Sequence, residues 1–390
     1  MLSSLGVPVI SRMWAETVDN ARTCHLASEV KNDYSRTLRV LLGIIQATNR
    51  SSGVESLLLS LFCGAGGLDH GFEEAGFEVG LALDRKQDSV KSYNLNRPTS
   101  SVAKVKDLSR VTVQDIDELY GREFRPTGVI GGPPCQSFSQ ANVNQKVDDV
   151  RTALPMAYAR LVVTLHERSP LDFFVMENVV GLVRRKHVAT LERVEDQLGE
   201  AGFKIARLLL NAKDHGTPQN RPRLFLVGVD GRRFKEADPK KFSVPVQPPM
   251  TVRTAIGDLP EPVHFARGLD MAEQGAHPNH WCMAPKSPKF SQEGGVKPGV
   301  KGRSFKMLNW DEPSIAVAYG HREVNIHPSG RRRLSVYEAL LLQGFPDDYV
   351  LTGTLSSQID QVSEAVPPPL AKAVADTLFK TLYSEKQAAA

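Results

Sequence analysis

The chain has 390 residues, 41% of them hydrophobic and 24% charged, which is typical of a soluble globular protein of about two domains. Its longest apolar run, LLGII, is far shorter than the ~20 residues of a membrane span, and the N-terminus lacks the pattern of a secretory signal. Four widely spaced cysteines without a Cys-x-x-Cys pair indicate a reducing compartment, so we expect a cytoplasmic protein.

The positive charge is concentrated in one part of the chain. The net charge is +4, but residues 231–333 hold 17 Lys and Arg against 10 Asp and Glu, a local excess of +7. A localised basic surface is typical of a protein that binds a polyanion. A solvated basic face without a partner fits the charge equally well.

In chain order, residues 1–54 form a leader without an assigned role. From residue 56, short apolar runs alternate with helix-length segments: LLLSLF, VGLALD, GVIGG, LDFFVMEN and RLFLVGV. This alternation predicts an α/β fold with a mostly parallel sheet and helices on both faces. Ligands of such sheets bind beyond the carboxyl ends of the strands, where we expect every candidate side chain.

The pattern changes again after residue 230. Residues 231–331 are rich in Pro, Gly and basic residues and predict a smaller, loop-rich and partly β domain. Helical patterning resumes over 332–385, where Leu340 to Phe345 is expected in the core, and 386–390 read as a tail. Residues 55–230 and 332–385 would then form one catalytic domain.

A glycine-rich turn follows the first apolar run. LFCGAGG places Gly64, Gly66 and Gly67 between a predicted strand and a helix, where a ligand can approach the backbone. The turn is neither a phosphate loop nor a complete G-x-G-x-x-G. Asp84 and Asp107 each follow a further strand, and Asp84 is suited to accept ribose hydroxyls. Together these residues predict a nucleoside cofactor without a pyrophosphate.

A single cysteine stands at another strand end. In GVIGGPPCQSFS, two glycines and two prolines lead to Cys135, which exposes and orients its thiol. Cys63, by contrast, is expected to be a small buried hydrophobe. His277, His280 and Cys282 in HPNHWC are metal-ligand types, but they have no fourth ligand at normal spacing, so we expect no metal.

These motifs occur in the order of a known family. With FFVMENVVGL, HGTPQNRPRLFLVGV, RRLSVYEALLLQGFPDDY and AVPPPLAKAVA, the chain resembles the DNA (cytosine-5) methyltransferases over residues 56–385, and most closely those of bacterial restriction–modification systems. The resemblance implies a Rossmann-like methyltransferase fold with a target recognition domain at 231–331. It implies S-adenosyl-L-methionine as cofactor, S-adenosyl-L-homocysteine as product and double-stranded DNA as substrate. It further implies a monomer at the nucleoid and a cognate restriction endonuclease as functional partner.

The resemblance also implies a role for individual residues. Phe62 would stack on the adenine, Asp84 would hold the ribose and Asp107 the adenine amino group, while the glycines and Pro133 shape the pocket. Cys135 would add to C6 of cytosine, because C5 is otherwise a poor nucleophile. Glu177 at N3 and Arg223 at O2 would meet the charge that develops on the ring. The remaining candidates in these motifs are Asn178, Gln219 and Arg221, and Arg221 can also be read as structural or phosphate-binding.

The target base must leave the DNA stack to reach such a site, and the run SQANVNQKVDD after Cys135 suits a lid over it. DNA-reading candidates are Gln136, Ser139, Arg303, Lys306, His321, Arg322 and Asn325.

The last motif departs from the family pattern. QVSEAVPPP has Ser363 and Glu364 where the family usually has Gly-Asn. We expect the loss of the small glycine and the neutral amide, together with the added charge, to weaken cofactor binding. Two alternatives stay open: a tRNA cytosine-5 methyltransferase on the same scaffold, and a catalytically impaired DNA-binding relative.

Overall fold

A seven-stranded sheet organises the chain. The computed structural model describes residues 56–134, 153–184, 187–266, 268, 277–291, 295–296, 306–317 and 325–388. The predicted leader, 1–54, lies outside these residues, and so does Cys135. The sheet order is β3-β2-β1-β4-β5-β8-β6. Its strands are β1 (Leu57–Leu61), β2 (Glu78–Asp84), β3 (Ala103–Val105), β4 (Gly128–Gly131), β5 (Phe173–Val179), β6 (Phe203–Asn211) and β8 (Pro222–Asp230).

The sheet is mostly parallel, as predicted. β3, β2, β1, β4 and β5 all run in one direction, whereas β8 is antiparallel to both β5 and β6. The sequence pattern did not reveal β6. This strand is at the sheet edge. Only Phe203 and Ala206 are buried in it and Leu209 is 60% exposed, so it lacks the continuous buried apolar run of an interior strand.

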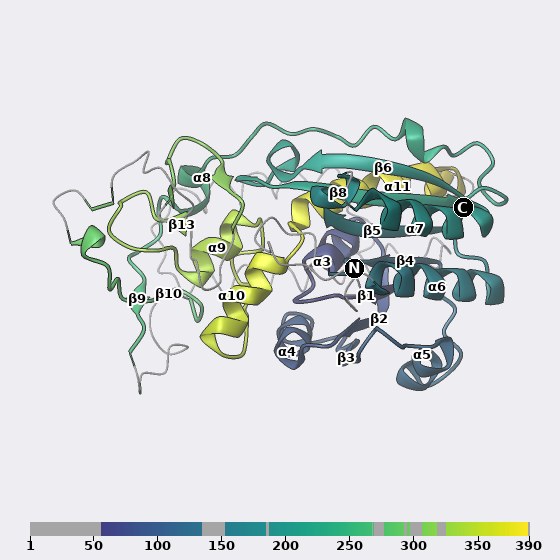
Figure 1. Cartoon of the computed structure of the whole chain (residues 1–390), viewed down its shortest axis with the longest axis horizontal. Coiled ribbons are helices and arrows are strands. Elements are labelled where there is room, and N and C mark those ends of the chain that lie inside the picture. Colours follow the sequence, from purple (N-terminus) through teal and green to yellow (C-terminus); the bar gives the residue numbers. More distant parts are fainter. Residues whose placement is uncertain are drawn as a thin grey trace, which may run out of the picture. The chain divides into compact units, whose positions relative to one another are not determined.

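Helices cover both faces of the sheet (Figure 1). α6 (Ala153–Arg168) and α7 (Val188–Glu200) lie side by side and share one core with α5 (Val113–Tyr120). α3 (Gly67–Glu74), α4 (Gln87–Leu95) and α11 (Pro368–Ala388) pack into a second core, in which α3 and α11 are in close contact. The C-terminal helix therefore returns to the first helix of the sheet and supports the turn that precedes it.

The segment between β8 and α11 has little regular structure. Composition predicted this for residues 231–331, whereas helical patterning was predicted from residue 332, where the last two helices of the segment lie. Its short helices are α8 (Val252–Ile256), α9 (Val336–Leu342) and α10 (Leu355–Glu364), and its single turns are η4 (Pro239–Lys241) and η5 (Pro288–Phe290). Its strands have two residues each: β9 (Val263–His264) pairs with β10 (Trp281–Cys282), and β11 (Lys306–Met307) pairs with β13 (Asn325–Ile326). β12 (Ser314–Ile315) pairs with the equally short β7 (Gln219–Asn220), which precedes β8. The remaining turns of the described chain, η2 (Val180–Val183) and η3 (Ala212–His215), follow β5 and β6.

A third apolar core holds this segment together. Leu340, Leu342 and Phe345 are buried in it, which confirms that the 340–345 stretch is core. α9 begins with a capping box, since Ser335 and Glu338 satisfy each other's backbone N–H groups. The boundaries of the predicted recognition domain stay a prediction. Within the described ranges, no helix combines the length and apolarity required to cross a membrane.

The contact between α3 and α11 leads to a test of stability. A methyl group added at Gly71 would lie 2.5 Å from the Lys372 nitrogen and from the Pro368 oxygen, both backbone atoms. Overpacking of this kind costs about 1–3 kcal/mol. We therefore expect Gly71→Ala to lower the free energy of unfolding by that amount, measured by urea denaturation.

Gly199→Ala in α7 is the matched control, because a methyl group there meets no atom within 4 Å. Alanine favours a helix over glycine by roughly 0.5–1 kcal/mol, so this variant should be as stable as the original or slightly more stable. Equal stability of the two variants would contradict the proposed close packing of α3 against α11.

Candidate functional site

The glycine turn after β1 has an unusual backbone. Phe62, Gly64 and Gly66 have φ values of 57°, 54° and 88°, and α3 starts at Gly67. A positive φ is rare for a bulky residue such as Phe62, and strain of this kind collects at ligand sites. A methyl group added at Gly64 would meet no atom within 4 Å. The turn therefore leaves open space at the place where the sequence predicts a ligand.

A buried polar network stabilises this turn through hydrogen bonds to its backbone. The Arg97 guanidinium donates to the Gly66 carbonyl at 3.2 Å, and the Tyr349 hydroxyl donates to the Ala65 carbonyl. Arg97 also pairs with Glu73 at 2.7 Å, and Tyr93 donates to the fully buried Asp69. Burial raises the pKa of Asp69 to about 6. The members of this network come from three distant segments without a shared motif, so the sequence pattern did not predict it.

Asp84 lies at the turn, as predicted. One carboxylate oxygen accepts from the Gly64 N–H at 2.9 Å and the other from the Lys86 N–H at 2.7 Å. Asp107 follows the neighbouring strand β3 and is exposed, and the Ser109 N–H that donates to it lowers its pKa. Since β3, β2 and β1 are adjacent and parallel, the two carboxylates and the glycine turn follow three neighbouring strand ends.

The chain that leads to Cys135 leaves the sheet beside this turn. β4 is the other neighbour of β1, and Gly132, Pro133 and Pro134 follow it. The Asn178 amide donates to the Pro133 carbonyl at 3.0 Å, which fixes the backbone two residues before the cysteine. Cys135, Gln136 and Ser139 themselves lie outside the described residues.

Glu177 and Arg223 meet next to this backbone. The Arg223 Nε lies 2.8 Å from Glu177 Oε1, and their side chains are only 13% and 11% exposed. A methyl group added at Gly132 would lie 3.1 Å from Glu177 Oε2, so the carboxyl group faces the approach to Cys135. Burial raises the pKa of Glu177 above its ordinary value, while the positive charges of Arg223 and Arg221 oppose that rise. Because its pKa is raised, the Glu177 carboxyl group holds a proton more readily than an ordinary glutamate does.

The position of Arg223 corrects one expectation. We expected every candidate at the carboxyl end of a strand, but Arg223 is the second residue of β8, and Gln219 and Arg221 precede that strand. Because β8 runs antiparallel to β5, its beginning lies at the edge where β5 ends, and Arg223 pairs in register with Val179. The start of β8 therefore lies at the same end of the sheet as the carboxyl end of β5.

Gln219 and Arg221 form hydrogen bonds mainly with backbone groups. Gln219 is fully buried, donates to the Leu342 carbonyl at 3.1 Å and accepts from the Val317 N–H at 3.1 Å. Arg221 donates to the carbonyls of Ser363 and Ala365 at 2.7 and 3.1 Å. These contacts favour the structural interpretation of Arg221 and give both residues a positioning role.

The DNA-reading candidates divide into three groups. Lys306 is exposed in β11 and stays a candidate. Asn325 does not fit the expectation, because it is 2% exposed in β13 and its amide donates to the Ala316 carbonyl. Arg303, His321 and Arg322 lie outside the described residues, as do Gln136 and Ser139.

The HPNHWC side chains have other partners. His277 stacks on Tyr337 with ring centroids 3.9 Å apart, and His280 bonds to the Ser335 hydroxyl and the Pro260 carbonyl. Across the described part of the chain, no cluster of three or more His, Cys, Asp or Glu is arranged to hold a metal ion. Cys63 is buried as expected, and burial raises the pKa of its thiol.

The altered last motif contacts the glycine turn. A methyl group added at Gly67 would lie 2.3 Å from the Val366 carbonyl oxygen, so the chain between α10 and α11 packs directly on the start of α3. Glu364 ends α10, and its Oε2 lies 2.6 Å from the Lys86 Nζ. The added negative charge is therefore paired.

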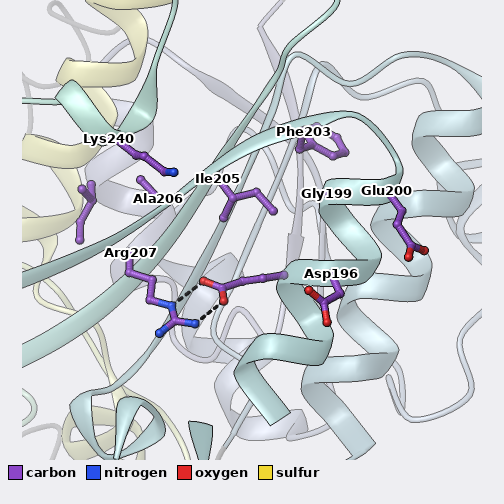
Figure 2. A pocket seen from close by; sticks show the side chains of 10 residues that line it. Asp196, Gly199, Glu200, Phe203, Ile205, Ala206, Arg207 and Lys240 are labelled. Carbon is purple, nitrogen blue, oxygen red and sulfur yellow. Dashed lines mark hydrogen bonds and ion pairs between the residues drawn. The ribbon is translucent and has the colours of Figure 1, made fainter. Parts of the chain in front are cut away.

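A hollow of about 770 Å³ lies elsewhere, between α7 and the edge strand β6. Arg207 pairs there with Glu195 of α7, and Figure 2 shows Arg207 together with Asp196 and Glu200 of the same helix. None of its lining residues is a predicted site residue. It is therefore distinct from the site at the strand ends.

Curated relatives match most of this chain. A type II methyltransferase, M.MthTI of Methanothermobacter thermautotrophicus, is 33% identical over 83% of this chain and 97% of its own length. M1.HphI of Haemophilus parahaemolyticus, also a type II methyltransferase, is 33% identical over 84% of this chain and 87% of its own length.

Solved structures share the fold. A DNA modification methyltransferase encoded in an E. coli prophage has a TM-score of 0.69 and 24% identity, covering 84% of this chain and 99% of its own. The Dnmt2 methyltransferase of S. pombe has a TM-score of 0.58 and 17% identity, covering 84% of this chain and 98% of its own. The family model for C-5 cytosine-specific DNA methylases matches residues 57–380. This chain therefore belongs to the C-5 cytosine-specific DNA methylase family.

Proposed function

We propose that the chain methylates C5 of cytosine in double-stranded DNA at a specific sequence, as the modification enzyme of a restriction–modification system. The observation that carries the proposal is the buried Glu177–Arg223 pair beside the backbone that leads to Cys135. Family membership supports the reaction, and the type II methyltransferases among the relatives support the biological role.

The residues at the glycine turn fit S-adenosyl-L-methionine. The open space at Gly64 admits a ligand against the backbone, and the oriented Asp84 carboxylate can accept hydroxyl donors of a ribose. Phe62 offers a ring at the same turn, and Asp107 a carboxylate beyond the next strand. When bound there, the cofactor supplies the methyl group and leaves as S-adenosyl-L-homocysteine.

The chain's own residues would activate the cytosine. The Cys135 thiolate adds to C6, and the π pair of the C5=C6 double bond shifts toward C4 and N3, which gives an enamine whose C5 is nucleophilic. Negative charge then develops at N3 and O2, which are neighbouring acceptors. A protonated Glu177 donates to N3 and the Arg223 guanidinium to O2, so the paired side chains match both atoms. Once C5 carries the methyl group, removal of the C5 proton by a base leaves the electrons of the C5–H bond to re-form the C5=C6 double bond, and the thiolate leaves C6.

The remaining proposals concern the partners of the chain, its oligomeric state and its location in the cell. The basic segment 231–331 would contact DNA phosphates, while a few of its side chains read base edges. One chain contains all the predicted cofactor and cytosine groups, so we propose a monomer. It would act in the cytoplasm at the nucleoid, beside a cognate restriction endonuclease that cuts the unmethylated site.

Covalent trapping tests the reaction. A duplex with 5-fluorocytosine in the target site should form a stable complex with the chain when the cofactor is present, because fluorine cannot leave as a proton does. The complex is measured as a band that resists denaturing electrophoresis. The target is found first by bisulfite sequencing of DNA from cells that express the chain.

Cys135→Ala is the control and should give no band. An absence of methylation and of trapping on every cytosine-containing duplex would instead indicate a catalytically impaired relative. Methyl transfer to tRNA but not to duplex DNA would overturn the proposed substrate.

The raised pKa of Glu177 predicts a pH dependence. The protonated fraction of Glu177 falls as the pH rises through its pKa, so the rate of methylation should fall on that alkaline side. Glu177→Gln keeps a hydrogen-bond donor but has no proton to lose. We expect its single-turnover rate to be roughly 10²-fold lower or more and to lack this alkaline decrease.

Cofactor affinity, measured by calorimetry, is the control for folding, and it should stay unchanged in Glu177→Gln. A variant with the alkaline decrease of the original chain would show that another group causes it.

A further inference from the structure

Two side chains far apart in the sequence form an ion pair beside the cofactor turn. Lys86 precedes α4 and Glu364 ends α10, and their charged atoms lie 2.6 Å apart. The Lys86 side chain is 30% exposed and that of Glu364 is 54% exposed. Glu364 stands where the family that the sequence resembles usually has asparagine, so the pair involves a position at which this chain departs from the family pattern.

Lys86 is linked to the predicted ribose-binding group. Its backbone N–H donates to one oxygen of Asp84, while the Gly64 N–H donates to the other. The Asp84 carboxylate is therefore oriented between the glycine turn and Lys86. A shift of the backbone at Lys86 would rotate or release that carboxylate.

Glu364 is linked to the other side of the same turn. The carbonyls of its neighbours Ser363 and Ala365 accept from Arg221, and the Val366 carbonyl packs against Gly67. The chain from 363 to 366 is thus held against the start of α3. The Glu364 carboxylate extends from it to the strand end that carries Asp84.

The two partners are already held in place by other contacts. The Asn96 side chain donates to the Val350 carbonyl and accepts from the Val350 N–H, and the Ser92 hydroxyl accepts from the Thr352 N–H. These bonds fix α4 to the segment that precedes α10. Less side-chain and backbone freedom is therefore lost when Lys86 and Glu364 meet.

We propose that Lys86 and Glu364 form a clasp, a pair of positioning residues that holds the α10–α11 connection against the Asp84 end of the cofactor site. The clasp keeps the Asp84 carboxylate oriented toward the ribose. This inference rests on the proposed binding of S-adenosyl-L-methionine at the glycine turn. In this proposal Glu364 favours cofactor binding, whereas the sequence alone predicted that its charge weakens cofactor binding.

Calorimetric titration of S-adenosyl-L-homocysteine into the full chain tests the clasp without DNA or turnover. Partly exposed ion pairs contribute up to about 1 kcal/mol, so Lys86→Met and Glu364→Gln should each raise Kd by roughly two- to fivefold. The reciprocal variant, Lys86→Glu with Glu364→Lys, should regain most of the lost affinity. Salt at about 1 M should reduce the difference between the original chain and the single variants, because it screens partly exposed charges.

Lys372→Met is the matched control. Lys372 pairs with Asp376 at 2.7 Å, with side chains 38% and 45% exposed, on the surface of α11. Its loss should leave the Kd unchanged. In steady-state assays, the clasp variants should raise KM for S-adenosyl-L-methionine and leave kcat and DNA affinity as they were.

Two results would overturn the clasp. Lys86→Met could weaken binding while Glu364→Gln leaves it unchanged or tightens it, which would mean that Lys86 acts on the ligand directly. Both single variants could also bind as tightly as the original chain. If the original chain itself fails to bind S-adenosyl-L-methionine and S-adenosyl-L-homocysteine, the proposed function fails, and this outcome is distinct from the other two.

Discussion

The direction of β8 determines where the candidate site can form. β8 is antiparallel to β5, so the start of β8 and the end of β5 reach one edge of the sheet together. This geometry places Arg223 beside Glu177, although 45 residues and two further strands separate them in the chain. A parallel β8 would carry Arg223 to the opposite edge. Removing one partner of a buried ion pair costs about 3–5 kcal/mol, so Glu177 and Arg223 also stabilise the folded state mutually.

The cofactor turn depends on a second constraint, since strained backbone must be held by its surroundings. Phe62 has a positive φ without the freedom of glycine. Arg97 and Tyr349 bind the carbonyls that follow it, and Gly66 has no side chain because Arg97 and Tyr93 occupy that space. The network binds carbonyl groups of the turn, and the space next to Gly64 stays available to a ligand. Its buried charges would be costly in isolation, and their mutual pairing reduces that cost.

Local sequence patterns predicted those parts of the site that lie at the end of a single strand or in the turn that follows it. The glycine turn, Asp84 and the approach to Cys135 each follow an apolar run, and the structure places them at adjacent strand ends. Local sequence did not predict contacts that depend on strand direction or on long-range packing. The edge strand β6 lacked a continuous apolar run, and Arg97 and Tyr349 share no motif with the turn they hold. Asn325 was selected for its chemistry, but burial removes it from the surface.

The altered last motif illustrates why a single departure from a family pattern is hard to interpret alone. Considered by itself, Glu364 adds a negative charge near a site that already contains Asp84, and the expected effect on cofactor affinity is unfavourable. The sign of that effect depends on Lys86, which is 278 positions away in sequence and 2.6 Å away in space. With Lys86 in place, a return to asparagine at 364 would remove the partner of a cation beside Asp84. Because the two side chains are in contact, the effect of changing Glu364 depends on the presence of Lys86, and the reverse also holds.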